Sequence, residues 1–503
     1  ASVIGASLLA SSPALANELR VGFTADALTL DPANHRKRET QTIIRNMHDG
    51  LVTRNSAMDV VGEIAKSWRQ VDQTTYEFIL HEGIKFHDGS DLTAEDIKYT
   101  FDRLIKDGML DGQTSPRKSL LGPLEEIVIV DATTIHFKLA SPWPLLPAML
   151  PFQEVVSKAH AEKVGAAGMA TNVNGTGPFK LVEWNKGDSV IMERFEDYYG
   201  GSNQIEPVGK ACVDRVIFKI IPENSSRVAA LLSGDVHIIN ELPSHAIAQV
   251  EQHPDTEVMT VNGTRSSYIA LNNQVAPFND IRVRKAIAHG LSRELIVDKI
   301  LDGNASIING ILSPDAFGKN PDLQSYDYDP DLAKSLLAEA GYPDGLDVTL
   351  DVVGAQKEIA EAISAVLSDA NIRVKVSVGE ASQLKTRYRT KGEPIDGQMW
   401  LTSWGNGSLD PVGIFVPTHR TADRGNSSGY SNPELDKILD AAGGETNPIE
   451  RVSLYQQAEA IVNNDLPYIY LWVAQDVYGV SKRLSNWQPS SDSRINLHDA
   501  CLN

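Results

Sequence analysis

A strand–helix–strand alternation in the second half of the chain is the feature that most constrains its fold. Residues 346–353 carry the apolar pattern of a strand, residues 358–370 that of a helix, and residues 374–378 that of a second strand. This order is typical of a sheet whose faces are covered by helices. The sequence therefore predicts an α/β protein with mixed sheets.

Strands and helices follow one another along the rest of the chain, whose 503 residues are enough for two or three domains. Alternating apolar residues predict a first strand, Glu18 to Phe23, that leads into Thr24-Ala25-Asp26. Thr93 is expected to cap a helix, and a long helix is expected from Ile281 to Leu301. Further strands are predicted at 75–80, 126–139 (a pair), 179–184, 215–222 and 468–473, and further helices at 39–50, 225–233, 329–341, 432–442 and 449–464.

Composition and charge exclude some classes of partner. The chain is 42% apolar and 22% charged, as soluble globular proteins are. Its net charge is −20, which argues against nucleic acid and anionic membrane surfaces, since both attract basic patches. No run of about 18 apolar residues follows the N-terminal segment, so no membrane span is expected in the mature chain.

The first sixteen residues resemble the end of a secretory signal peptide. They contain no charge, and Ala14-Leu15-Ala16 fits the small-x-small cleavage pattern. We expect cleavage after Ala16 and export to the periplasm; a short N-terminal helix is the alternative. Export favours a disulfide between the two cysteines, Cys212 and Cys501, over two unpaired buried thiols.

No catalytic or metal-binding motif stands out. His81, His87 and Asp88 lie close in sequence, but their spacing does not match metal-ligand spacing, so solvated or packing histidines are expected. GxSxG, P-loop and GxGxxG patterns are absent. A Ser/His/Asp triad stays open, because its members need not be adjacent. We expect neither a cofactor nor a metal.

The stretch from Trp404 to Pro411 has the composition of a ligand-binding loop. It follows an apolar, strand-like run and holds a Trp, an amide, a hydroxyl, two glycines and a carboxylate within eight residues. Glycines expose backbone N–H groups, and the indole offers a flat apolar wall. These groups suit a small polar molecule; the alternative is an ordinary turn after a strand.

Several motifs resemble one family in the family's own order. The chain is similar to the extracellular solute-binding proteins that serve dipeptide, oligopeptide and nickel importers. The likeness covers nearly the whole mature chain and rests on these segments: Leu30-Asp31-Pro32; Gly83 to Gly89 with Leu92 to Asp96; Gly175-Thr176-Gly177-Pro178-Phe179; Pro277 to Ala286; Trp404 to Pro411; and Gly429 to Asp436.

The resemblance implies a two-lobed periplasmic binding protein fold with mixed sheets, an extra subdomain in the first lobe and two interlobe crossings. The crossings are expected within residues 264–273 and 468–473. The expected bounds are a signal peptide remnant at 1–16, lobe 1 at 17–266 with a subdomain inserted at about 55–170, lobe 2 at 267–476, and a return to lobe 1 at 477–503.

The resemblance also implies a function. A monomeric, periplasmic, non-catalytic binding protein would capture a small solute between its lobes and deliver it to an ABC permease in the inner membrane. Peptide-binding members carry an aspartate three residues after the tryptophan, and it pairs with the peptide ammonium. Here Gly407 stands at that position.

A missing acid favours a non-standard ligand, such as an opine or a sugar-phosphate conjugate, held by neutral donors and by a cation, Arg265. Gln153 lies about where nickel-binding members use an arginine, which argues against a nickel chelate. The predicted ligand-binding residues are Trp404, Asn406, Gly407, Ser408, Asp410, Arg265, Ser266, Thr24, Ala25, Asp26 and Gln153.

Three alternatives remain. An ordinary peptide could bind if Asp410 or Asp26 replaced the missing acid. A secreted hydrolase could use scattered acids such as Asp88 and Asp410, although no motif supports it. A chemoreceptor partner or structural envelope protein is the third.

Overall fold

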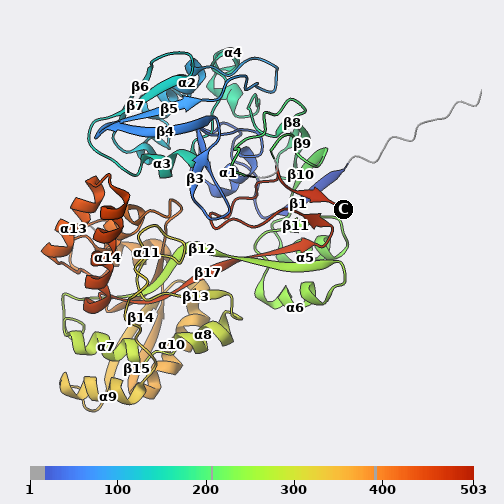
Figure 1. Ribbon diagram of the computed structural model, residues 1–503. Coiled ribbons are helices and arrows are strands. Elements are labelled where there is room, and N and C mark those ends of the chain that lie inside the picture. Colours follow the sequence, from blue (N-terminus) through green and yellow to red (C-terminus); the bar gives the residue numbers. More distant parts are fainter. Residues whose placement is uncertain (1–16, 206–207, 390–392) are drawn as a thin grey trace, which may run out of the picture.

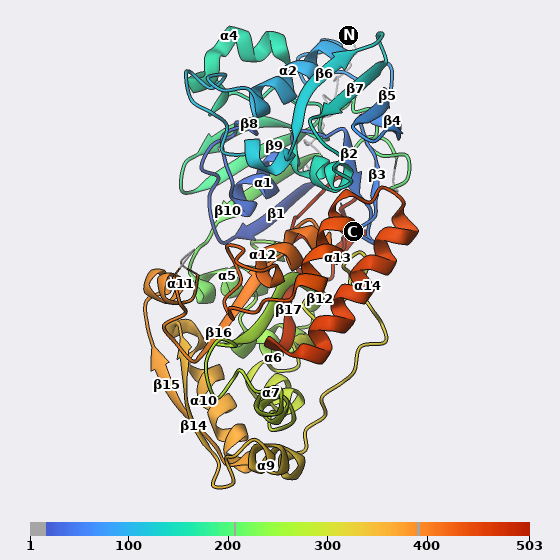
Figure 2. The ribbon, with the colours of Figure 1, turned by 90° about the vertical axis from the view of Figure 1, so that its left-hand side faces the viewer.

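The computed structural model describes residues 17–205, 208–389 and 393–503. The predicted signal peptide, residues 1–16, lies outside the described residues. The chain forms two lobes, which Figures 1 and 2 show from two directions. We call lobe 1 the part that contains β1 to β11, α1 to α6 and the chain after β17, and lobe 2 the part that contains β13 to β16 and α7 to α14.

Lobe 1 begins with β1 and ends with a C-terminal tail. Its first half holds β1 (Glu18–Phe23), α1 (Arg38–Ile44), β2 (Val52–Arg54), β3 (Val60–Gly62), β4 (Ala65–Asp72), β5 (Thr75–Leu80), α2 (Ala94–Ile105), β6 (Leu124–Ile129), β7 (Thr134–Leu139) and α3 (Leu146–Met149). The rest holds α4 (Lys158–Met169), β8 (Phe179–Asn185), β9 (Ser189–Arg194), β10 (Arg215–Ile220), α5 (Asn224–Leu232), β11 (Ile238–Ile239), α6 (Ser244–Gln252), and in the tail β18 (Leu484–Ser485) and β19 (Cys501–Leu502).

Two long strands join the lobes. β12 (Thr256–Leu271) and β17 (Tyr468–Ser481) pair antiparallel along their length and run from one lobe into the other (Figure 1). They form the middle of an 11-stranded mixed sheet of the described residues, ordered β15-β14-β16-β12-β17-β11-β1-β10-β9-β8, with β13 beside β17. The two predicted interlobe crossings are confirmed. The exact domain bounds stay a prediction.

The inserted part of lobe 1 has a core of its own. β4, β5, β7 and β6 form an antiparallel sheet, and α2 lies against β6. Phe78, Phe101 and Phe137 are buried together there, with ring centroids 4.7–4.9 Å apart in the two pairs that touch. Thr93 caps α2 in a reciprocal capping box with Asp96, as predicted.

Lobe 2 is built on the predicted strand–helix–strand unit. Its elements are α7 (Ile281–His289), α8 (Arg293–Ile300), β13 (Ala305–Ile307), α9 (Pro330–Glu339), β14 (Leu346–Val352), α10 (Lys357–Leu367), β15 (Ile372–Val378), α11 (Ala381–Arg389), β16 (Met399–Gly405), α12 (Phe415–His419), α13 (Pro433–Gly444) and α14 (Pro448–Asp465). β14 pairs parallel with both β15 and β16.

One long helix was predicted where the structure has two. The helix expected from Ile281 to Leu301 breaks after His289, and α8 begins at Arg293. The Ser292 hydroxyl accepts a hydrogen bond from the Leu295 N–H, which caps a new helix start. The apolar periodicity continues across the break, so it concealed the cap.

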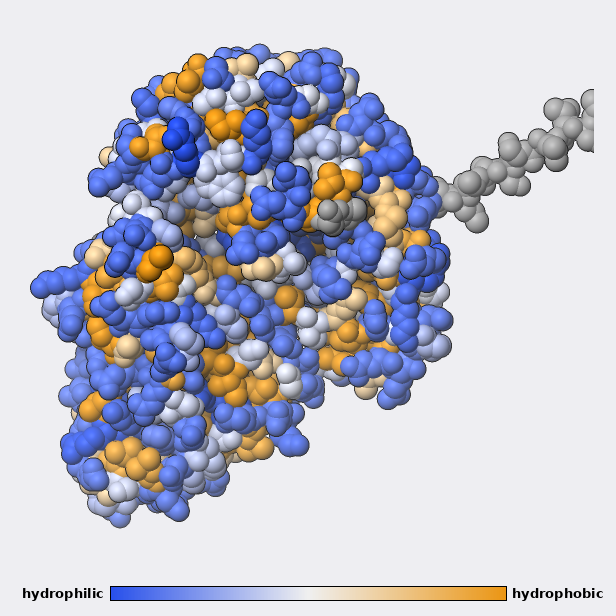
Figure 3. All heavy atoms as spheres, viewed as in Figure 1, coloured by the Kyte–Doolittle hydropathy of each residue, from blue (hydrophilic) through white to orange (hydrophobic). Residues whose placement is uncertain are grey.

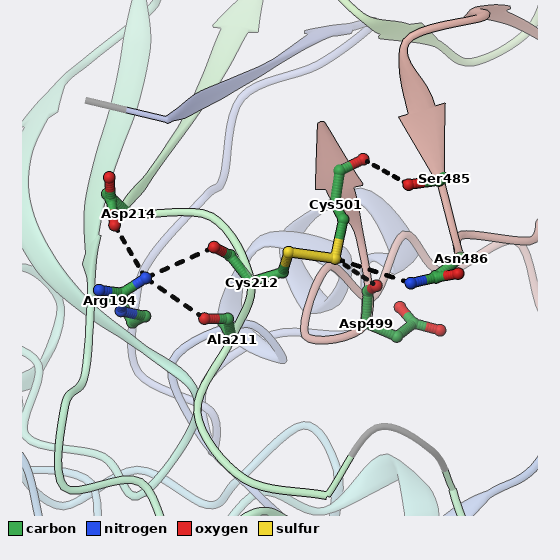
Figure 4. Close-up of a disulfide and its surroundings, with 8 residues drawn as sticks. All are labelled: Arg194, Ala211, Cys212, Asp214, Ser485, Asn486, Asp499 and Cys501. Atoms are coloured by element: carbon green, nitrogen blue, oxygen red, sulfur yellow. Dashed lines mark hydrogen bonds and ion pairs between the residues drawn. A yellow bond between two sulfur atoms is a disulfide. The ribbon is translucent and has the colours of Figure 1, made fainter. Parts of the chain in front are cut away.

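A disulfide ties the tail to lobe 1, as predicted. Cys212 and Cys501 are bonded across 289 residues of sequence, with their Cα atoms 5.2 Å apart (Figure 4). β19, which contains Cys501, pairs with β18. Next to Cys212, Arg194 forms an ion pair with Asp214 at 2.8 Å. The bridge therefore fastens the short C-terminal strand β19 to the segment of lobe 1 between β9 and β10.

Replacing both cysteines by serine should lower the free energy of unfolding by about 2 kcal/mol, because the bridge limits the freedom of the unfolded chain over a very long loop. Urea unfolding followed by circular dichroism measures this change. A reducing agent should reproduce the loss in the parent protein and have no effect on the Cys212→Ser/Cys501→Ser variant. Equal urea midpoints for the two proteins would contradict a stabilising role.

Candidate ligand-binding site

The loop after β16 holds its own shape through internal hydrogen bonds. The Asn406 side chain donates to the Asp410 carbonyl at 3.1 Å and accepts from the Ser408 hydroxyl at 2.9 Å. The Trp404 indole N–H donates to the Gly413 carbonyl at 3.0 Å. The side chains of Asn406 and Ser408, which the sequence assigned to the ligand, therefore build the loop that carries Trp404.

Asp410 is engaged in a buried ion pair. Its carboxylate receives two hydrogen bonds from the Arg451 guanidinium of α14, at 2.6 and 2.8 Å. Both side chains are 6% exposed. A carboxylate that is already neutralised and buried is a poor partner for a ligand ammonium. The geometry gives Asp410 the task of joining the loop to α14.

The lobe 1 residues predicted for the site lie at the carboxyl end of β1. Thr24, Ala25 and Asp26 are half-buried. The Asp26 carboxylate accepts hydrogen bonds from the Trp184 indole at 2.9 Å and from the Gly187 N–H at 2.7 Å. Asp26 is therefore engaged too. Next to these residues, Leu28 is 65% exposed and offers an apolar surface.

Two predicted site residues are buried inside the protein. Gln153 is 1% exposed, and its side-chain oxygen accepts from the Arg117 guanidinium at 3.1 Å. Ser266 is fully buried in β12, between β16 and β17. Neither side chain is open to a solute in this arrangement.

Arg265 lies beside the loop, where it pairs in register with Gly405, and its role in ligand binding stays a prediction. Its guanidinium lies over Gly405, where a Cβ would meet Nη2 at 2.9 Å. The residue is exposed, yet burial is the main cause that lowers its pKa, followed by the charge of Arg38.

Arg38 approaches the same place from lobe 1. It is the first residue of α1, and its guanidinium donates to the Ser493 hydroxyl at 2.7 Å and to the Thr264 hydroxyl at 3.5 Å. Within the described ranges, no carboxylate lies within 4.0 Å of the guanidinium of Arg38 or Arg265. Asp476 lies near Arg38. Burial raises the pKa of Asp476, and the charge of Arg38 offsets part of this rise.

Two further arginines lie over the Trp404 ring. The guanidinium carbons of Arg389 and Arg424 are 5.2 and 4.9 Å from the ring centroid. Gly425 leaves room for the indole, because a Cβ there would lie 2.6 Å from it. Sequence reasoning missed both arginines, since no motif links α11 or the segment after α12 to Trp404.

One hollow of a small-molecule size lies elsewhere in lobe 1. It has a volume of about 380 Å³ and lies between the end of α1 and the tail. Two of its arginines have acidic partners: Arg45 pairs with Glu63 at 3.2 Å, and Arg494 pairs with Asp492, which lies outside the lining of the hollow. We take the Trp404 loop as the candidate site, because in the described part of the chain Arg38 and Arg265 beside it have no carboxylate within 4.0 Å.

The histidines near Gly175 have packing roles. His87 contacts the Gly177 carbonyl at 3.0 Å and packs edge-on against Phe195. Across residues 17–205, 208–389 and 393–503, no group of three His, Cys, Asp or Glu side chains is placed to hold a metal ion.

Hydrophilic residues cover most of the face in Figure 3. No described helix is long and apolar enough to span a bilayer.

Acid should destabilise the protein partly through His48. Burial lowers the pKa of His48 to about 4, and its ring donates to the Val155 carbonyl at 3.0 Å. In the unfolded chain this pKa is near 6.5, so between those values the unfolded state binds more protons. Stability should therefore fall as the pH drops from about 6.5 to 4, by up to ~1.4 kcal/mol per pH unit from this residue.

The His48→Gln variant should show a flatter dependence of unfolding free energy on pH over that window, whatever its stability at pH 8. Urea unfolding at several pH values measures the slope. His245→Gln, at an exposed position, should keep the parent slope. An unchanged slope in His48→Gln would show that His48 does not contribute.

Comparisons with known proteins agree on one family. The family model described as "Bacterial extracellular solute-binding proteins, family 5 Middle" matches residues 59–426. Glutathione-binding protein GsiB of Escherichia coli O1:K1 / APEC is 28% identical over 514 residues, covering 99% of this chain and 97% of that protein.

Two solved structures with bound solutes are also similar. The Helicobacter pylori periplasmic binding protein DppA, in complex with the peptide STSA, is 26% identical with a TM-score of 0.72, covering 96% of this chain and 98% of that one. AgaA of A. tumefaciens R10, in complex with agropinic acid, is 25% identical with a TM-score of 0.71, covering 97% and 99%.

Proposed function

This chain belongs to the family 5 bacterial extracellular solute-binding proteins, and from that premise we propose that it binds a small anionic solute of a non-standard kind, such as an opine or a sugar-phosphate conjugate. Its general role is that of the periplasmic solute-binding component of an ABC importer. We propose that it acts as a monomer, without catalysis, and passes its solute to the permease.

The observation that carries the proposal is the pair of arginines beside the Trp404 loop. Arg38 and Arg265 come from different parts of the chain, and after burial the charge of Arg38 is the next cause that lowers the pKa of Arg265. No carboxylate pairs with either within the described residues. A carboxylate or phosphate would relieve this repulsion and form charge-assisted hydrogen bonds with both. Gly407 supplies no acid that would repel it.

The two-lobed fold supports a hinge mechanism. β12 and β17 are the strands that connect the lobes, so bending within them would open and close the space between the lobes. A solute that touches Arg38 in lobe 1 and the Trp404 loop in lobe 2 would stabilise the closed form. It can shift the equilibrium only by the difference between its affinities for the closed and open forms.

An ordinary peptide is the second candidate. Relatives over nearly the full length include a glutathione-binding protein and a protein solved with the peptide STSA. Two acids could replace the missing aspartate, Asp26 and Asp410. Both carboxylates already accept hydrogen bonds from other side chains of the protein, which argues against a peptide. Asp88, suggested for a hydrolase, accepts hydrogen bonds from Ser90. We therefore propose a binding protein without enzymatic activity.

Mass spectrometry of solutes released by denaturing the purified protein tests this proposal most directly. Titration calorimetry on protein unfolded and refolded without solute should then be done with a panel of opines and sugar phosphates and with a panel of di- to pentapeptides. We expect a dominant released anion and a response to the first panel. Tight binding of peptides with no response to the first panel would overturn the proposed ligand class while leaving the importer role intact.

A further inference from the structure

Two lobe 1 residues contact consecutive residues of the Trp404 loop across the interlobe boundary. The Arg54 guanidinium donates to the Ser408 carbonyl at 2.8 Å. The Phe152 ring lies 3.7 Å from the position that a Cβ on Gly407 would occupy. We call these two contacts the closure contacts. They join the lobes directly, with protein groups on both sides.

Arg54 is anchored to lobe 1 and cannot follow the loop when the lobes separate. Besides Ser408, its guanidinium donates to the Met58 carbonyl at 2.7 Å and to the Ala148 carbonyl at 3.1 Å. Burial, followed by the charge of Arg494, lowers the pKa of Arg54 to about 10, so the side chain is still a cation at neutral pH. Opening the lobes must therefore break a charge-assisted hydrogen bond to Ser408.

The backbone of Phe152 is also anchored within lobe 1. Its carbonyl accepts hydrogen bonds from the Gln41 side chain at 3.1 Å and from the Arg117 guanidinium. On its ring, the Arg494 guanidinium carbon lies 5.3 Å from the centroid. The ring presents an apolar surface to Gly407, at an ordinary van der Waals distance from the position of a Cβ there.

The tail adds a third connection nearby. The Ser491 hydroxyl, in the segment that the disulfide fastens to lobe 1, donates to the Asp315 carboxylate of lobe 2 at 3.3 Å. This bond is longer than the Arg54 bond, 3.3 Å against 2.8 Å, and Asp315 is exposed to water, so we expect it to contribute less. It shows that the lobes touch at more than one place along the boundary.

We infer that Arg54 and Phe152 form a latch that stabilises the closed arrangement of the lobes independently of any solute. The latch bears on the loop that carries Trp404, so it would also hold this loop in its binding position. Its main effect would be on solute release, because release requires opening. Capture by the open form would not need the latch.

The latch has a measurable consequence for the unliganded protein. Each closure contact exists only in the closed form. Removing it therefore lowers the ratio of closed to open molecules by the factor that corresponds to the whole free energy of the contact. We expect Arg54→Ala to lower that ratio at least about tenfold, and Phe152→Ala to lower it several-fold. Dissociation rates of a bound solute should rise by similar factors, while association rates should rise only in proportion to the gain in open molecules.

Distances between spin labels on the two lobes test the latch without any ligand. Labels at Val130→Cys in lobe 1 and Leu295→Cys in lobe 2 use exposed positions, 53% and 47% exposed. We expect a short-distance population in the parent that shrinks in Arg54→Ala and in Phe152→Ala. Arg69→Ala, which removes an arginine with a 71% exposed side chain in lobe 1, is the matched control and should keep the parent distribution.

Arg54 also supports lobe 1, so its removal could unfold that region; Phe152→Ala, which keeps all three carbonyl contacts of Arg54, separates the two effects. Identical distance distributions in the parent and in both variants would overturn the latch. A parent that populates only the long distance would overturn it as well. Because no solute is present, neither result bears on the proposed ligand class.

Discussion

Asp410→Ala should lower the free energy of unfolding by about 3 to 5 kcal/mol, measured by urea unfolding without any solute. The change removes one partner of a buried ion pair and leaves the Arg451 guanidinium, 6% exposed, without a counter-charge. Arg451 keeps hydrogen bonds to the Ala442 carbonyl and the Tyr455 hydroxyl, but neither carries a negative charge. Without the carboxylate, most of the free energy needed to remove the Arg451 charge from water is no longer offset by an ion pair.

The double variant Asp410→Ala/Arg451→Met should be more stable than Asp410→Ala alone, since no buried charge remains. Asp440→Ala provides the matched control, because Asp440 pairs with Arg420 at an exposed position and its loss should change stability by about 1 kcal/mol or less. If Asp410→Ala kept its stability and lost solute binding, Asp410 would be a ligand contact and its structural role would be wrong.

The fold was predictable wherever local pattern and family motif coincide. The strand pair at 126–139, the unit at 346–378 and the capped helix after Thr93 follow from periodicity and a capping pair. The disulfide followed from two cysteines in an exported chain. What could not be predicted is pairing between distant side chains, such as Asp410 with Arg451, because nothing in the sequence says which arginine faces which carboxylate.

The same distinction applies to the site. Trp404 and Arg265 could be selected because a motif and a crossing strand marked them, and the structure brings them to one loop region. The polar side chains of that motif look free in sequence, but Asn406 and Ser408 bond to their own loop. Arg38, Arg389 and Arg424 come from three separate segments, so only the folded chain shows that they gather around it.

Arg265→Ala should weaken solute binding roughly 100-fold, equivalent to about 3 kcal/mol, while leaving the unfolding free energy without solute nearly unchanged. The expected loss is large because the solute's acidic group would leave water and then lack one of its two guanidinium partners. The stability should hold because, among the described residues, the Arg265 guanidinium makes one hydrogen bond, to the Ser403 hydroxyl at 3.5 Å, and lies near the like charge of Arg38. Calorimetry with the identified solute measures the loss.

Arg265→Lys separates charge from geometry. Lysine keeps the positive charge but not the planar fork of donors, so we expect binding between that of the parent and that of Arg265→Ala. Trp404→Ala should also weaken binding, through loss of the apolar wall. Arg373→Ala, at an exposed ion pair far along lobe 2, is the control that should bind as the parent does. A large fall in solute-free stability in Arg265→Ala would reassign the residue to structure, and unchanged binding would move the anion site away from β12.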